Sequence, residues 1–104
     1  MLRRVVLWRM KAEDVDQRAK DALQIKEALE SMRGKIPGML AIDVGVNVSN
    51  SPDASEVCMM VDYEDEAALA VYETHPVHEA VKPVVGPLRS ERRVSEFFMQ
   101  SPTA

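Results

Sequence analysis

The chain has 104 residues, of which 46% are hydrophobic, and carries a formal net charge of −4 at pH 7. This length and apolar share are typical of a globular chain with one core, so we expect residues 1–104 to form a single domain. The acidic balance disfavours nucleic acid as a partner, although Arg89, Arg92 and Arg93 form a local basic cluster.

The sequence shows no pattern of membrane insertion or secretion. No apolar run approaches the length that spans a bilayer, and residues 1–10 carry arginines inside their apolar stretch, unlike a signal peptide. We therefore expect a cytoplasmic protein without a membrane partner. Cys58 is the only cysteine, which excludes an intramolecular disulfide and a thiolate zinc site. We expect it to be a buried, inert thiol.

The first predicted element is a strand over residues 2–10, LRRVVLWRM. Its residues alternate, so that one face carries Arg4, Val6, Trp8 and Met10. If that face looks toward the core, Trp8 lies buried under a helix.

A long amphipathic helix is predicted next. Asp14, with Gln17 three residues later, has the form of a capping box, and apolar residues then recur at helical spacing to about Arg33. Gly34 can take the left-handed position that ends such a helix.

Two strands joined by a polar loop follow the Pro37-Gly38 turn. Residues 39–48 alternate in the manner of a strand, residues 47–55 are rich in Ser, Asn, Asp and Pro, and residues 56–63 return to β-type composition. We expect a hairpin.

The second half of the chain predicts two short helices and a last strand. Asp65 is a good N-cap for a helix over residues 65–74. Pro76 breaks that helix and fits the first position of another, which runs to Val85. Residues 89–99 then have the composition of a final strand.

The predicted order β-α-β-β-α-β is that of a ferredoxin-like α+β fold, with the helices packed on one face of an antiparallel sheet. The other sheet face would also be apolar, because it carries Val5, Leu7, Ala41, Cys58 and Met60. We therefore expect a homodimer in which the two sheets pack face to face.

The only two histidines lie together in the segment YETHPVH, with Tyr72, His75 and His78. If Tyr72 ends one helix and His78 begins the next, the phenol and an imidazole can converge between sheet and helices. An imidazole can then act as a base and a phenol can donate to an oxyanion. The competing interpretation is structural: a histidine before a proline often caps a helix, and a helical tyrosine usually belongs to the core. Neither histidine belongs to a metal-ligand pattern, so no metal site is expected.

Several segments together resemble the stress-responsive A/B barrel domain family. They are RRVVLWRMK, GKIPG, VGVNVS, VDYEDEAAL and, most specifically, YETHPVH. The resemblance covers nearly the whole chain and implies a ferredoxin-like subunit that pairs into a dimeric α/β barrel. The family includes stress-induced plant proteins, bacterial members of unknown role and a plant polyketide cyclase.

Carried over from that cyclase, the resemblance puts Tyr72 at the position of its phenol and His78 at that of its general base. His75 matches the family's other histidine. Glu96 falls where the cyclase has an acidic residue on the last strand, so Glu96 could orient His78. Arg4 departs from the family, because relatives often have a histidine near this position.

Two functions remain open from the sequence. The first is a small dimeric module, with its pocket filled or holding an apolar metabolite. The second is a cofactor-independent enzyme of cyclase, isomerase or monooxygenase type, with His78 as base and Tyr72 as oxyanion donor. The candidate ligand-binding residues are Arg4, Trp8, His75 and Glu96. Arg4, on the face of Trp8, would then anchor an anionic metabolite and lower the pKa of His78. Alternatively, Arg4 points to solvent from a frayed strand end.

Overall fold

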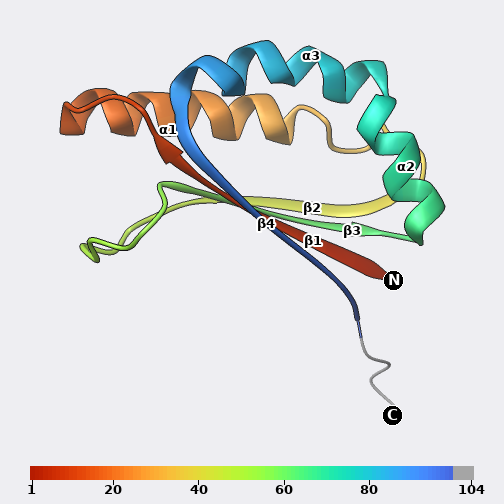
Figure 1. Cartoon of the computed structure of the whole chain (residues 1–104). Coiled ribbons are helices and arrows are strands. Elements are labelled where there is room, and N and C mark those ends of the chain that lie inside the picture. Colours follow the sequence, from red (N-terminus) through yellow and green to blue (C-terminus); the bar gives the residue numbers. More distant parts are fainter. Residues whose placement is uncertain (100–104) are drawn as a thin grey trace.

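A computed structural model of the chain describes residues 1–99, in which four antiparallel strands form one sheet and the helices lie on one side of it (Figure 1). The elements, in chain order, are β1 (Leu2–Met10), α1 (Val15–Glu30), β2 (Met39–Val46), β3 (Val57–Tyr63), α2 (Glu66–Thr74), α3 (Pro76–Val85), the 3₁₀ turn η1 (Gly86–Leu88) and β4 (Arg89–Phe98). The strand order is β2-β3-β1-β4. The expected ferredoxin-like α+β fold is confirmed. Residues 100–104 of the domain predicted over 1–104 lie outside the described residues.

The boundaries differ from the predicted ones by a few residues. Helix α1 ends at Glu30 rather than near Arg33, because the following residues turn and Gly34 takes a positive φ of 74°. The alternation expected for β2 fails at its start, where the pairing with β3 shifts register between Met39 and Ala41. Leu40 is consequently 54% exposed.

The core lies between the sheet and the helices. On the β1 face that meets them, Val6 and Trp8 are 1% and 4% exposed, which confirms that Trp8 is buried. Ile25 and Leu29 of α1 pack into the same core. The apolar residues of β3 that alternate toward this face are all buried. Strands β1, β2 and β3 therefore contribute alternate side chains to a single core, as the period of a half-covered sheet requires, whereas β4 has no residue in the buried core.

Within residues 1–99, no helix covers the opposite face of the sheet (Figure 1). Leu7 is 37% exposed, Met60 36% and Phe97 46%. The register places these residues on the outer face, together with Cys58, which pairs with Leu7 across β1 and β3. Cys58 is therefore half-buried rather than fully buried as expected. The residues Val5, Leu7, Cys58, Met60 and Phe97 are called the outer apolar face below.

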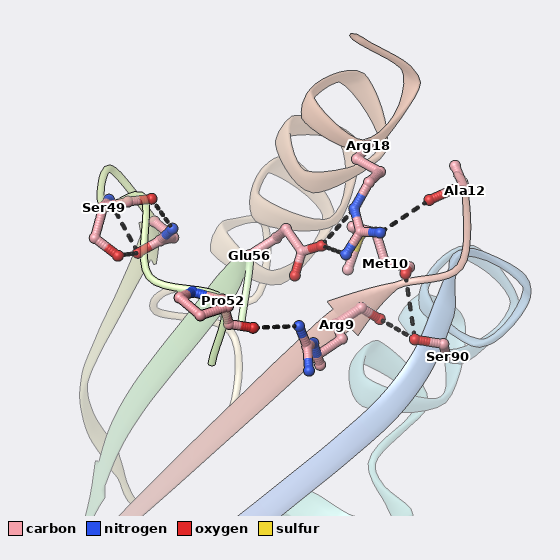
Figure 2. A network of polar contacts seen from close by, with 9 residues as sticks. Arg9, Met10, Ala12, Arg18, Ser49, Pro52, Glu56 and Ser90 are labelled. Atoms are coloured by element: carbon pink, nitrogen blue, oxygen red, sulfur yellow. Dashed lines mark hydrogen bonds and ion pairs between the residues drawn. The ribbon is translucent and has the colours of Figure 1, made fainter. Parts of the chain in front are cut away.

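A network of polar contacts fixes the end of the sheet near Met10 (Figure 2). Arg18 of α1 pairs with Glu56, just before β3, and Arg9 donates to the carbonyl of Pro52 in the β2–β3 loop at 3.0 Å. Ser90 donates to the carbonyl of Met10 at 3.2 Å. These contacts tie α1 to the start of β3, and they tie β4 and the long loop to β1, at the end of that strand opposite Arg4. No helix among residues 1–99 has both the length and the apolar character to cross a lipid bilayer.

Candidate functional site

A cavity of about 740 Å³ lies between the sheet and the helices. Its apolar wall comes from both layers and consists of Val6, Trp8, Leu29, Met59, Val81 and Val85. Its polar groups include Arg4 of β1, Tyr72 of α2 and His78 of α3. The cavity has the volume and the mixed lining that are typical of small-molecule sites.

The break between α2 and α3 places Tyr72 and His78 together. His75 has an extended backbone, as a residue before proline prefers, and its N–H donates to the carbonyl of Tyr72 at 3.1 Å. Its ring Nδ1 accepts a hydrogen bond from the N–H of Val77 at 3.1 Å, and Pro76 occupies the first turn of α3. His75 therefore caps α3. It does not line the cavity, so its interpretation as a ligand-binding residue is replaced by the structural one.

The rings of Tyr72 and His78 are stacked, with centroids 4.0 Å apart and planes inclined by 24°. The second tyrosine, Tyr63 of β3, lies with its ring 5.4 Å from that of Tyr72. His78 Nδ1 lies 3.3 Å from the carbonyl oxygen of Glu73. Since a carbonyl oxygen only accepts, this contact favours the tautomer with the proton on Nδ1 and leaves Nε2 as the basic atom.

Burial shifts the pKa of both rings toward their neutral forms. It lowers the pKa of His78 and is the largest cause, while the charges of Lys82 and Arg4 act in the same direction. The lowering expected from Arg4 is therefore found, but Arg4 is a minor contributor. Burial also raises the pKa of the Tyr72 phenol, against the opposing charges of Arg4 and Arg92. At neutral pH the pair thus offers an unprotonated imidazole beside a protonated phenol.

Arg4 lies inside the site and not at a frayed strand end, because it is only 9% exposed. Its Cζ atom is 5.7 Å from the centroid of the Tyr72 ring, within the range of a cation–π contact. Its Nε atom lies 3.4 Å from Oε1 of Glu96, and no hydrogen-bond partner is found for Nε or Nη1 within residues 1–99.

The resemblance suggested that Glu96 orients His78, but the structure pairs Glu96 with Arg4 instead. The β1–β4 register places Glu96 directly opposite Arg4, so its carboxylate meets the guanidinium and not the imidazole. The carbonyl of Glu73 contacts the imidazole instead. This contact joins the His78 side chain of α3 to a backbone carbonyl of α2. No pattern of residue types in the sequence predicts such a contact.

The cavity also contains two arginines that the site prediction did not include, Arg89 and Arg92 of β4. The alternation along β4 puts Arg92 on the same face as Glu96, but only the pairing with β1 shows that this face looks toward the helices. The described residues contain no group of three or more His, Cys, Asp or Glu side chains placed to hold a metal ion.

The fold is similar to those of several solved structures. A dimeric protein of unknown function from Bacteroides fragilis is 20% identical, with 94% of this chain and 95% of that chain covered and a TM-score of 0.83. A dimeric ferredoxin-like protein of unknown function from Thermobifida fusca is 19% identical, with 94% and 90% covered and a TM-score of 0.81. A hydroxynitrile lyase from Passiflora edulis is 14% identical, with 95% and 93% covered and a TM-score of 0.77.

A search of curated proteins found no match. A family model, described as the stress responsive A/B barrel domain, matches residues 2–99, which is nearly all of the chain. The segment that carries Tyr72, His75 and His78 lies inside this match. The chain therefore belongs to the stress responsive A/B barrel domain family.

Proposed function

We propose that this protein is a dimeric domain whose cavity binds a small molecule with an apolar body. The observation that carries the proposal is that Arg4, Tyr72 and His78 gather at a cavity of about 740 Å³ that also has an apolar wall. A tightly packed space between sheet and helices would have left both rings without access to a ligand. The apolar wall would bind the body of the molecule, and the polar groups would fix its orientation.

The dimer would form through the outer apolar face. Residues such as Leu7, Met60 and Phe97 are between 36% and 46% exposed there, and contiguous apolar surface of this kind is typical of an interface. Two similar folds, from Bacteroides fragilis and Thermobifida fusca, are described as dimeric. The location of the protein in the cytoplasm stays a prediction from the sequence.

Ligand binding can be tested at neutral pH with two probes that share one carbon skeleton, the anion 4-phenylbutyrate and the uncharged 4-phenylbutan-1-ol. We expect at least one of them to shift the indole N–H resonance of Trp8, which lines the cavity. A Val81→Trp variant should fill the cavity and abolish the shift, because Val81 is a buried lining residue. The matched control is Val71→Trp at a position of α2 that is 46% exposed. If neither probe shifts Trp8, the binding function is refuted.

A second candidate function is proton abstraction from a carbonyl compound. It is favoured by one observation, the contact of His78 Nδ1 with the Glu73 carbonyl, which leaves Nε2 basic beside the phenol of Tyr72. His78 would take a proton from the carbon next to the carbonyl, and Tyr72 would donate to the enolate oxygen. No cofactor is needed for this step.

Deuterium exchange of acetophenone in D₂O tests this candidate. We expect the protein to accelerate exchange of the methyl protons, and His78→Gln and Tyr72→Phe each to reduce the acceleration at least tenfold. His75→Gln is the matched control, because His75 caps α3 outside the cavity. Equal exchange rates for the parent and His78→Gln, or no acceleration by the parent, would refute the role of His78 as a base. The binding function would then be the one that remains.

A further inference from the structure

The cavity is cationic although the whole chain is acidic. The chain has a net charge of −4, whereas the lining contains Arg4, Lys82, Arg89 and Arg92 against Glu73 and Glu79. Lys82 and Glu79 pair with each other on α3 at 2.7 Å and neutralise one another. The lining charge that remains comes from arginines of β1 and β4 and from a single carboxylate.

Arg4 is the most deeply buried of these charges, and its hydrogen bonding is incomplete. It is 9% exposed, and neither its Nε nor its Nη1 has a hydrogen-bond partner among residues 1–99. Glu96, at 3.4 Å from Nε, is too far for a strong charge-assisted hydrogen bond. Burying a guanidinium is costly unless its charge is paired and its N–H groups are bonded. An acceptor with a negative charge in the cavity would provide both.

Arg89 and Arg92 stand on the neighbouring strand. Arg92 lies opposite Trp8 in the β1–β4 register, and Arg89 lies opposite Met10. Burial lowers the pKa of Arg92, and repulsion from Arg4 and from Arg89 lowers it further, so the three charges act on one another. A shared anion would relieve this repulsion.

We propose that the cavity selects amphipathic monocarboxylates, with the carboxylate bound by Arg4 and Arg92 and the apolar body packed on the wall around Trp8. The guanidinium fork fits a carboxylate in two parallel hydrogen bonds. A single negative charge suits the site better than a phosphate dianion, because Glu73 also lines the cavity and Glu96 already faces Arg4. This inference rests on the proposed binding function and adds the charge and class of the ligand.

The test compares three probes that share one skeleton, by calorimetry at pH 7.5: 4-phenylbutyrate, 4-phenylbutan-1-ol and 4-phenylbutylamine. We expect the carboxylate to bind at least tenfold more tightly than the alcohol, and the amine more weakly than either. Arg92→Gln should reduce the preference for the carboxylate at least threefold, and raising the salt concentration should reduce it as well.

Arg93→Gln is the matched control. Arg93 carries the same charge on the same strand but pairs with Leu7 on the outer face, so the change should leave the preference as it is. Sedimentation of each variant verifies that the assembly is unchanged. Arg4→Lys provides a further arm: it keeps the charge but loses the fork, and should weaken the carboxylate more than the alcohol.

Equal affinities for carboxylate and alcohol, or an Arg92→Gln variant with the parent's preference, would overturn the inference and leave the binding function intact. If none of the three probes binds below about 10 mM, a Kd equivalent to less than about 3 kcal/mol, the binding function fails together with it.

Discussion

Replacing Trp8 by alanine tests whether the indole joins the sheet to the helices. Trp8 is 4% exposed, so nearly the whole side chain is removed from water on folding. An aromatic side chain buries about 150–250 Å², which at about 25 cal/mol per Å² corresponds to roughly 4–6 kcal/mol. The alanine keeps part of this, and the new void opens into the existing cavity, where water can enter. We therefore expect a loss of about 3–4 kcal/mol in the free energy of unfolding, at the lower end for such substitutions.

The assay is urea unfolding followed by far-ultraviolet circular dichroism, at one fixed protein concentration because a dimer gains stability with concentration. Val15→Ala is the control, since Val15 is 78% exposed and its loss should change stability by less than about 0.5 kcal/mol. If Trp8→Ala does not fold, Trp8→Phe should show a smaller loss of the same sign. A loss below about 1 kcal/mol for Trp8→Ala would refute the assigned packing.

Four further outcomes follow from the structure. Because burial lowers the pKa of His78, the unfolded chain binds more protons than the native one below pH 6.5. The free energy of unfolding should therefore fall as the pH drops through this range, and urea unfolding should show a smaller fall for His78→Gln. Arg4→Ala should raise the pKa of His78 in an NMR titration only part of the way to the ordinary value, since burial is the larger cause; an unchanged pKa would remove Arg4 from the site. Met60→Lys on the outer apolar face should yield monomers at micromolar concentration in sedimentation, whereas Leu23→Lys on α1, at 52% exposure, should not; a persistent Met60→Lys dimer would place the interface elsewhere. Asp65→Ala removes an N-cap that accepts from a backbone N–H at 2.9 Å and should cost about 1 kcal/mol in thermal unfolding, and no loss would contradict the cap.

Part of the candidate site could be predicted from residue order alone. The segment YETHPVH brings a phenol and an imidazole together because Pro76 forces a break after α2, and this local constraint survives in any tertiary setting. The role of His75 could be narrowed but not decided, since a histidine before a proline can cap a helix or face a ligand. In the structure His75 Nδ1 accepts a hydrogen bond from the N–H of Val77, so His75 is a helix cap.

The partners of Arg4 could not be predicted. Alternation along residues 2–10 puts Arg4 on the face of Trp8, but it does not say which strand lies alongside. The register of β1 with β4, residues far apart in the chain, brings Glu96 opposite Arg4 and Arg92 opposite Trp8. Strand pairing of this kind depends on long-range contacts, whereas the sequence pattern reports only short-range ones.

The sequence by itself determined the order of the elements and which side chains share a face, because the periods of strands and helices and the effects of Pro76 and Gly34 act within a few residues. Only the tertiary structure decided which strand of the sheet adjoins which, that Cys58 is half-buried on the outer face, and that Arg4, Arg89 and Arg92 line the same cavity. The physical reason is that these features depend on the packing of two layers whose contacts join residues at opposite ends of the chain.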